Sequence, residues 1–158
     1  MITGNLNICR AAMTTKKRDI SNPETSVLIV DDSMQYSMVL QKILQGVFGY
    51  HDVTTVDNPG DAFKLISEDP EKFGMLFVDY NFPDGNTGGD LLNQLAKNDL
   101  IKDKVAFLIT SEPTPDNMKA AINAGALGVV AKPFDREELK RQLEKARRAR
   151  EIDEVDSF

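Results

Sequence analysis

The sequence predicts an α/β protein in which a doubly wound parallel sheet carries helices on both faces. Two observations lead to this prediction. Short runs of apolar, mostly β-branched residues recur along the chain, and most end at a polar residue, as is typical of strands buried on both faces. Between these runs, apolar residues return at intervals of three and four, which is the spacing of a helix with one buried face.

The first two strand-and-helix units lie in the first half of the chain. Residues 27–30 are the first predicted strand, and the apolar residues between 36 and 48 form one broad helical face after it. Residues 53–56 are a short second strand. A second helix is marked by apolar residues at 62–66 and must end before Pro70, because a proline disfavours helical geometry in the residue that precedes it.

The third and fourth units follow the same alternation. Residues 75–78 are the third predicted strand, and leucines at 91–95 mark the helix after it. Residues 106–109 are the fourth strand. Thr114 then offers an N-cap with Pro115 at the first helical position, which is a strong signal for the start of a helix.

The last unit completes the predicted sheet. In the helix that starts at Pro115, the spacing of Met118, Ala121 and Ile122 predicts that these three side chains face inward. Residues 129–131 are the fifth strand, and the final helix has a buried stripe at 139–146. Five successive units of this kind predict the doubly wound sheet.

The composition favours a single soluble domain. The chain has 158 residues with 41% hydrophobic content, and its net charge of −6 argues against a nucleic-acid partner, which usually needs a basic stripe. No apolar run approaches the ~20 residues of a membrane span, and the N-terminus lacks the apolar core of a signal peptide. We therefore expect a cytoplasmic protein without a membrane partner. The single cysteine, Cys9, is compatible with a reducing compartment.

Three segments are expected along the chain. Residues 1–25 are polar and lack apolar periodicity, so they are expected to form a flexible extension, in which Met1 and Met13 are alternative starts. Residues 26–150 carry all of the predicted strands and helices and form the domain. Residues 151–158 are expected to be an acidic tail.

Three aspartates stand directly after predicted strands. Asp31 and Asp32 follow the first strand, and Asp79 follows the third. Side chains at the carboxyl ends of parallel strands converge on one crevice, where neighbouring carboxylates repel unless a cation such as Mg²⁺ relieves them. The alternative for the first pair is an exposed loop in which one aspartate caps the helix, although Ser33 could also be that cap. The alternative for Asp79 is a turn-forming role.

A lysine and a threonine occupy equivalent positions after two other strands. Lys132 follows the fifth strand and Thr110 the fourth. Alone, a lysine at a strand end is usually a solvated flank, and threonine is a common strand residue. Together with three carboxylates in one crevice, an ammonium and a hydroxyl indicate a site that binds a metal and receives a phosphoryl group.

At this point the sequence resembles the receiver domain of two-component response regulators, in particular the stand-alone CheY-like type. The resemblance covers about residues 26–150. It is carried by Val-Leu-Ile-Val-Asp-Asp-Ser at 27–33, Phe-Val-Asp-Tyr-Asn-Phe-Pro at 77–83, Leu-Ile-Thr-Ser-Glu at 108–112 and Ala-Gly-Ala-Leu-Gly-Val-Val-Ala-Lys-Pro-Phe at 124–134. It implies a flavodoxin-like, five-stranded parallel sheet of order 2-1-3-4-5 with five helices.

The resemblance also implies a role for each site residue. Asp79 is the phosphoacceptor, and Lys132 and Thr110 contact the phosphoryl group. Asp31, Asp32, Asp79 and the backbone carbonyl of Asn81 are the implied ligands of Mg²⁺, the implied cofactor. Asp32 is the direct ligand of the acidic pair, and Asp31 binds mainly through water. The Lys132-Pro133 peptide bond is expected to be cis.

Further positions set the expected speed and output of the switch. Asn81 and Glu112 occupy the family positions that influence dephosphorylation, and both match the fast chemotaxis type. The family usually carries Tyr or Phe three residues before the lysine, whereas this chain has Val129, so the usual aromatic readout at this switch position is in doubt.

The implied partners are a sensor histidine kinase or a histidine phosphotransfer protein, and an unknown downstream protein. The expected surface for output, or for a phosphorylation-dependent dimer, is formed by the helix after Thr114, the strand before Lys132 and the last helix. Like other receivers, the protein would not be an enzyme in the usual sense, since it catalyses only its own phosphotransfer and dephosphorylation.

Three alternatives remain open at the level of sequence. A receiver-like scaffold that works without phosphorylation is compatible with Val129. A metal-dependent phosphohydrolase similar to the haloacid dehalogenase family would want Asp-x-Asp at the nucleophile, where this chain has Asp79-Tyr80-Asn81. A flavodoxin-like flavin binder would need a hydroxyl-rich loop after the first strand, where Asp31 and Asp32 would repel a phosphate.

Overall fold

The computed structural model of the chain describes residues 19–156, and the side chains of residues 19–149. In chain order the elements are β1 (Ser26–Val30), α2 (Met34–Gly46), β2 (Val53–Val56), α3 (Pro59–Glu68), β3 (Phe73–Asp79), α4 (Gly88–Lys97), β4 (Val105–Thr110), α5 (Pro115–Asn123), β5 (Gly128–Ala131) and α6 (Arg136–Asp156). Every strand and helix expected from the sequence is present. No helix among the described residues is both long and apolar enough to cross a membrane.

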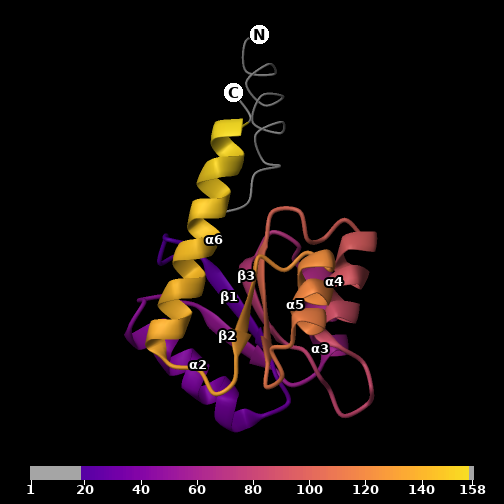
Figure 1. The fold of residues 1–158 in the computed structure, drawn as a ribbon. Helices are drawn as coiled ribbons and strands as arrows, with labels where there is room; N and C mark the ends of the chain where they lie inside the picture. The colour runs from indigo at the N-terminus through magenta and orange to yellow at the C-terminus, as the bar shows by residue number, and fades with distance from the viewer. Residues whose placement is uncertain (1–18, 157–158) are drawn as a thin grey trace.

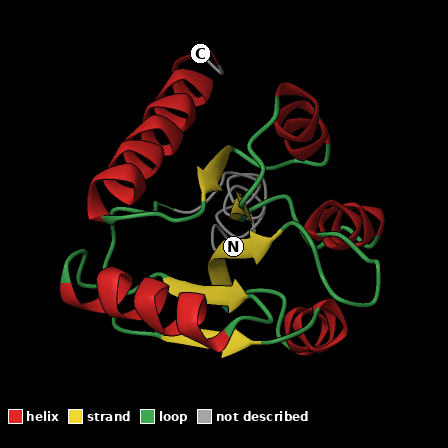
Figure 2. Ribbon diagram, turned by 60° about the horizontal axis from the view of Figure 1, so that its bottom comes forward, coloured by secondary structure: helices red, strands yellow, loops and turns green. Residues whose placement is uncertain are grey.

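The strands form one five-stranded sheet in the order β2-β1-β3-β4-β5, which confirms the predicted fold class and order. All four strand pairs are parallel. Helices α2 and α6 lie on one face of the sheet, and α3, α4 and α5 lie on the other (Figures 1 and 2). Because every strand runs in the same direction, all five carboxyl ends meet at one edge of the molecule.

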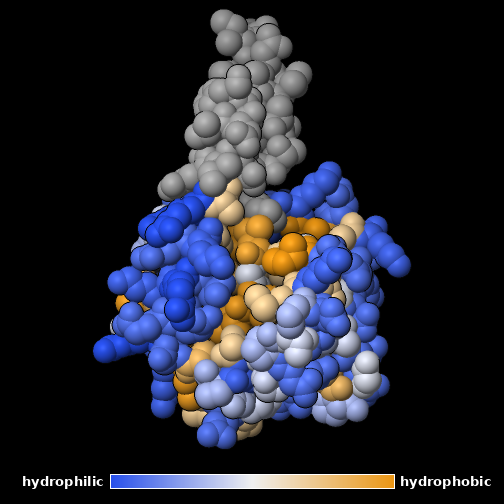
Figure 3. All heavy atoms as spheres, viewed as in Figure 1, coloured by the Kyte–Doolittle hydropathy of each residue, from blue (hydrophilic) through white to orange (hydrophobic). Residues whose placement is uncertain are grey.

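Helix α5 packs differently from the prediction. Of the three residues expected to face inward, only Ala121 is buried, whereas Met118 is 44% exposed and Ile122 is 53% exposed. The small residues Ala121 and Ala124 form the contact with the core, so the bulkier side chains of α5 stay outside it. A band of apolar residues is visible on this side of the molecule, between the hydrophilic surface of α6 and helix α5 (Figure 3).

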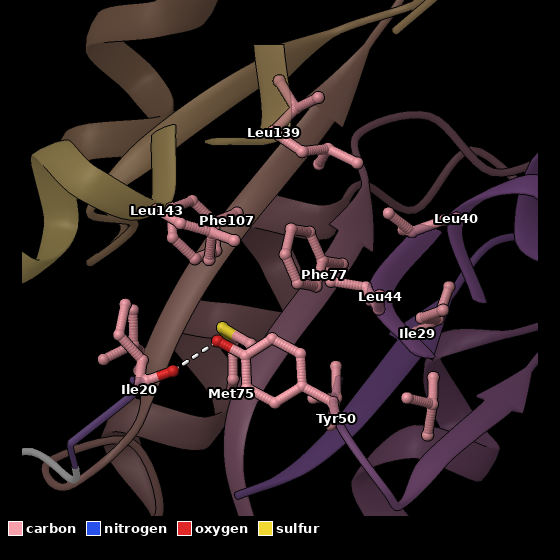
Figure 4. Packing of buried hydrophobic residues seen from close by; sticks show 14 of the residues in the cluster. Ile20, Ile29, Leu40, Leu44, Tyr50, Met75, Phe77, Phe107, Leu139 and Leu143 are labelled. Carbon is pink, nitrogen blue, oxygen red and sulfur yellow. Dashed lines mark hydrogen bonds between the residues drawn. The ribbon is translucent and has the colours of Figure 1, made fainter. Parts of the chain in front are cut away.

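Alternation along the strands divides the core into two clusters, one under each layer of helices. In β1, Val27 and Ile29 belong to the cluster under α2 and α6, and Leu28 and Val30 belong to the cluster under α3, α4 and α5. All four are fully buried, as expected of a parallel sheet covered on both faces. In the first cluster the stacked rings of Phe77 and Phe107 lie 5.0 Å apart between their centroids (Figure 4).

The packed domain begins before residue 26, which corrects the expected extent of the flexible extension. Ile20 is 3% exposed and belongs to the core cluster under α2 and α6. Its carbonyl oxygen accepts a hydrogen bond from the Tyr50 hydroxyl (Figure 4). The Thr25 hydroxyl donates to the carbonyl of Asp19, which closes the turn that brings Ile20 back to the sheet. Residues 1–18 of the expected extension lie outside the described residues.

The last helix extends past residue 150, the expected end of the domain. Helix α6 continues through Asp156, six residues into the segment expected to be an acidic tail. Glu137 and Glu138 lie in the first turn of this helix, where negative charge is favourable next to the positive end of the helix dipole. The side chain of Asp135 accepts a hydrogen bond from the backbone N–H of Glu138, which satisfies one donor at the start of the helix.

Candidate functional site

The carboxyl end of the sheet brings together the acidic residues identified in the sequence. Asp31 and Asp32 follow β1 directly, and Asp79 is the last residue of β3, the neighbouring strand. One carboxylate oxygen from each of the three lies within 4.8 Å of the others. Asp31 and Asp79 are buried, at 3% and 8% exposure, whereas Asp32 is exposed. The three carboxylates therefore form a partly buried acidic cluster.

Lys132 follows β5, an edge strand of the sheet, and its side chain extends to this acidic cluster. Its Nζ lies 2.9 Å from Oδ2 of Asp31 and 3.5 Å from Oδ1 of Asp79. The lysine side chain is only 8% exposed, which excludes the solvated-flank interpretation. The Lys132-Pro133 peptide bond is cis, as expected. Thr110, at the end of β4, is 3% exposed, and its carbonyl oxygen accepts a hydrogen bond from the backbone N–H of Lys132 at 2.7 Å.

Burial and crowding of negative charge act on Asp79. Loss of solvent and then the nearby Asp31 carboxylate raise the pKa of Asp79 from 3.8 to about 6, and the Lys132 ammonium opposes this rise. The acidic cluster thus stores unfavourable electrostatic energy that a cation would relieve. A hard divalent cation suits this donor set, since Mg²⁺ prefers carboxylate oxygens and usually takes one or two of them from the protein.

A hydrogen bond in the loop after β1 holds the carboxylate of Asp31 close to Asp32 and Asp79. The backbone N–H of Ser33 donates to Oδ1 of Asp31 at 2.9 Å. Ser33 is itself the N-cap of α2, where its side chain accepts a hydrogen bond from the N–H of Tyr36 at 3.4 Å. The alternative in which an aspartate caps this helix is therefore wrong, because the serine has that role.

Close packing behind Asp79 fixes the end of β3. Gly88, the first residue of α4, is fully packed: a Cβ there would collide with the carbonyl oxygen of Asp79 and lie 2.7 Å from Leu108 and 3.0 Å from Val78. The N–H of Gly88 donates to the carbonyl of Tyr80 at 2.8 Å. Only a glycine allows α4 to approach the end of β3 this closely, so Gly88 helps to fix the position of Asp79.

The loop between β4 and α5 is held by side chains on both sides. The hydroxyl of Thr110 accepts a hydrogen bond from the N–H of Glu112 at 3.0 Å. The Asn117 side chain, in the first turn of α5, donates to the carbonyl of Glu112 at 2.9 Å. The capping residue Thr114 accepts from the N–H of Asn117, as predicted for a helix that starts at Pro115. A shift of Thr110 would therefore be transmitted to the start of α5.

The remaining candidate residues lie within three positions of Asp79, Thr110 or Lys132 in the sequence. Asn81 is exposed and forms an isolated antiparallel bridge with Thr87 in the loop that follows β3. Glu112 is also exposed. Val129 is half-buried in β5 and packs against the core cluster under α3, α4 and α5.

One residue at the site was missed by the sequence reasoning. This residue is Tyr36, in the first turn of α2. The centroid of its ring lies 4.3 Å from the Nζ of Lys132. The Tyr36 ring also contacts the ring of Phe134, with centroids 5.9 Å apart and an interplanar angle of 44°. No local pattern signals this contact, because Tyr36 reads as one more member of an apolar helical stripe.

Comparison with known proteins shows the family to which the chain belongs. Residues 27–144 match the response regulator receiver domain, and the chain belongs to this family. The match includes all three aspartates, Thr110 and Lys132. Receiver domains generally bind Mg²⁺ at an acidic pocket, and CheY-like receivers interact with histidine kinases and downstream targets.

The similar proteins include CheY-like regulators from bacteria and a plant regulator. Chemotaxis protein CheY of Pseudomonas aeruginosa is 30% identical over 119 residues, which cover 75% of this chain and 93% of that protein. Two-component response regulator ORR3 of Oryza sativa subsp. japonica is 32% identical over 121 residues, 77% of this chain and 88% of that protein. The solved structure of Vibrio cholerae CheY4 has a TM-score of 0.68 at 26% identity and covers 77% of this chain and 98% of its own.

Proposed function

We propose that this protein is a phosphorylation-dependent signalling switch in which Asp79 accepts a phosphoryl group from a phosphohistidine. The donor is a sensor histidine kinase or a histidine phosphotransfer protein. The observation that carries the proposal is the meeting of Asp31, Asp32 and Asp79 with Lys132 at one end of the sheet, with Nζ 2.9 Å and 3.5 Å from two of the carboxylates. Family membership favours this function over the hydrolase and flavin-binding alternatives.

The proposed reaction is a displacement at phosphorus. An ionised oxygen of Asp79 attacks the phosphorus atom while the P–N bond to the donor imidazole breaks. The imidazole leaves with the bonding electron pair and takes up a proton, and Asp79 carries an acyl phosphate. With a pKa of about 6, the Asp79 carboxyl is mostly ionised at neutral pH and able to act as the nucleophile.

The surrounding charges support transfer in the proposed site. Lys132 is placed to donate a hydrogen bond to a phosphoryl oxygen, since its Nζ already lies 3.5 Å from the attacking carboxylate. Asp31, Asp32 and Asp79, with the backbone carbonyl of Asn81, are the groups that would hold Mg²⁺. When bound, this ion supplies positive charge that offsets the negative charge developing on the transferred group.

The lifetime of the signal is proposed to depend on Asn81 and Glu112. Both residues are exposed and each follows a site residue by two positions, so they are proposed to influence the access of water to an acyl phosphate. Both match the residues of fast chemotaxis receivers, so we expect a short-lived phosphorylated state.

The output is proposed to leave through α5, β5 and α6. Phosphorylation adds ~1.5 to 2 negative charges beside Thr110. A hydrogen bond from the Thr110 hydroxyl to the phosphoryl group would draw in the loop at Glu112 and the start of α5. Val129 would respond by repacking, as an aliphatic side chain has no ring to swing.

The apolar band seen in Figure 3 supports this surface as the place of contact. Met118 and Ile122 are exposed on α5, so the helix that moves also carries apolar side chains for a partner. The partner is a downstream protein or a second copy in a phosphorylation-dependent dimer. With its acidic balance, the protein is proposed to act in the cytoplasm without nucleic-acid or membrane partners.

The test is phosphorylation of the purified protein with acetyl phosphate and Mg²⁺, followed by intact-mass spectrometry. The wild type is expected to gain one phosphoryl group, and Asp79→Ala none. Asp84→Ala is the matched control, because Asp84 is an exposed aspartate in the loop after β3 and should leave the gain unchanged. Removal of Mg²⁺ with EDTA should abolish the gain. Phosphorylation that survives in Asp79→Ala, or that fails in the wild type, would overturn the proposal in favour of a scaffold.

A further inference from the structure

The side chain of Lys132 has two kinds of neighbour in the crevice. Two are carboxylates, at 2.9 Å and 3.5 Å from Nζ, and the third is the face of the Tyr36 ring, whose centroid lies 4.3 Å from the same atom. An ammonium within about 6 Å of an aromatic centroid is attracted by the negative face of the ring, and the attraction grows when the pair is desolvated. Lys132 is 8% exposed, so this pair is largely screened from water.

The Tyr36 ring is itself held from two directions. The Ser33 side chain caps α2 and accepts the hydrogen bond of the Tyr36 N–H, which fixes the backbone one turn into the helix. The ring packs against Phe134, which follows Lys132 by two residues and rests on the core cluster under α2 and α6. The ring that lies over the lysine therefore comes from α2 and is supported by Phe134, which is distant from Tyr36 in the sequence.

We propose that Tyr36 is a positioning residue for the phosphorylation reaction and acts through Lys132. In part this inference rests on the proposed function, because it concerns the step in which Lys132 meets the phosphoryl group. The tyrosine contacts neither Asp79 nor the phosphoryl group in the proposal. Its role is to keep the ammonium beside the acidic cluster in every state of the site.

The physical reason is a competition for the carboxylates. Asp31 and Asp79 hold Lys132, but they are also the groups that would bind Mg²⁺. A divalent cation on these oxygens weakens their attraction for the ammonium and repels it directly. The ring of Tyr36 takes no part in metal binding, so its attraction for Lys132 persists. The ring keeps Nζ within reach of a phosphoryl oxygen when the carboxylates no longer do.

The experiment compares Tyr36→Phe, which keeps the aromatic face, with Tyr36→Leu, which removes it at similar size. Two quantities are measured for each. The first is the rate of phosphorylation by acetyl phosphate at saturating Mg²⁺, in the wild-type and Lys132→Met backgrounds. The second is the NMR chemical shift of the Lys132 ε-protons, with and without Mg²⁺, because a ring above the ammonium moves these resonances upfield. Thermal unfolding of each variant checks that the fold is retained.

The expected result separates positioning from packing. Tyr36→Leu should slow phosphorylation about three- to tenfold in the wild-type background and have no further effect in Lys132→Met. Tyr36→Phe should retain most of the rate. The upfield shift of Lys132 should persist with Mg²⁺ in the wild type and Tyr36→Phe, and should vanish in Tyr36→Leu.

Three outcomes would overturn the inference. They are a wild-type rate in Tyr36→Leu, equal loss in Tyr36→Phe and Tyr36→Leu, and no ring-dependent shift of Lys132 once Mg²⁺ is bound. The NMR measurement needs no phosphoryl transfer. If the wild type takes up no phosphate, the proposed function fails, and the shift of Lys132 alone decides whether Tyr36 holds it.

Discussion

The sheet buries one lysine near each of its two ends, and the two are held by different kinds of group. Lys104 stands just before β4 at the amino end and is 1% exposed. Its Nζ donates to the carbonyl of Pro70 at 2.5 Å and lies 3.3 Å from a carboxylate oxygen of Asp103. Lys132 follows β5 at the carboxyl end and lies between Asp31 and Asp79, with further negative charge on Asp32 beside them.

The difference shows why burial of a lysine does not by itself define a functional site. At the amino end a backbone carbonyl and a neighbouring carboxylate satisfy the ammonium, and the arrangement joins the loop after α3 to the start of β4. At the carboxyl end the negative charges exceed the positive charge, and the pKa of Asp79 is raised to about 6. The amino end contributes stability, whereas the crowded negative charge at the carboxyl end lowers stability, as expected of the proposed site for a cation and a phosphoryl group.

The largest expected effect that separates the two lysines is on phosphorylation. Lys132→Met should lower the rate of phosphorylation by acetyl phosphate about a hundredfold or more, since a charge that stabilises the transferred group is removed. Lys104→Met should leave this rate unchanged. The measurement is the time course of phosphoprotein formation at saturating Mg²⁺, followed by intact mass.

The matched control for this pair is stability. Lys104→Met leaves the Pro70 carbonyl without its donor and should lower the free energy of unfolding by about 2 kcal/mol. Its normal phosphorylation rate would then show that lost stability alone does not slow the reaction. A rate loss of similar size in both variants would mean that the two lysines do not differ in their effect on phosphorylation.

Removing the charge of Asp79 is expected to change the free energy of unfolding in buffer that contains EDTA. The folded-state pKa of about 6 lies above the ordinary value of 3.8, so the unfolded chain ionises this carboxyl more readily. The resulting penalty to folding is complete above about pH 6, shrinks as the pH falls from 6 towards 3.8, and is absent below. Asp79→Asn should therefore raise the free energy of unfolding by about 3 kcal/mol at pH 8 and by only about 0.5 kcal/mol at pH 4.

Denaturant unfolding at several pH values measures this dependence. Addition of Mg²⁺ should narrow the gap between the wild type and Asp79→Asn, because the ion offsets the same repulsion. A stability difference that stays constant from pH 8 to pH 4 would show that the raised pKa of Asp79 is not its cause.

The carboxyl end of the sheet could be predicted from the sequence because its signal is local. A polar residue directly after a fully apolar strand has one position in a parallel sheet, so Asp79 and Lys132 were brought to the same edge by topology alone. The cap at Ser33 and the helix start at Thr114 follow from side-chain chemistry within a few residues. These features need no knowledge of tertiary distances.

The features that were missed depend on packing between distant elements. Ile20 is a lone apolar residue in a polar segment, so no periodicity marks its place in the core. In α5 both faces carry apolar residues at helical spacing, and only the close approach of the helix to the sheet selects Ala121 over Met118 and Ile122. Contact between Tyr36 and Lys132 joins two elements that are remote in the chain, and nothing in either segment indicates it.

The smallest effect concerns the carboxylate next to Lys104 and should have the opposite sign to that of Asp79. The side chain of Asp103 is 20% exposed and lies 3.3 Å from Nζ of Lys104. Asp103→Asn keeps the size of the side chain and removes a charge that helps to hold a buried ammonium. It should lower the free energy of unfolding by about 0.5 kcal/mol at pH 8, because water screens part of the attraction. Loss of a negative charge would thus lower the stability of the protein in Asp103→Asn, at the amino end, and raise it in Asp79→Asn, at the carboxyl end. Both variants are compared with the wild type by denaturant unfolding. A gain in stability for Asp103→Asn would show that negative charge is unfavourable at both ends of the sheet. The two lysines would then not differ in their surroundings.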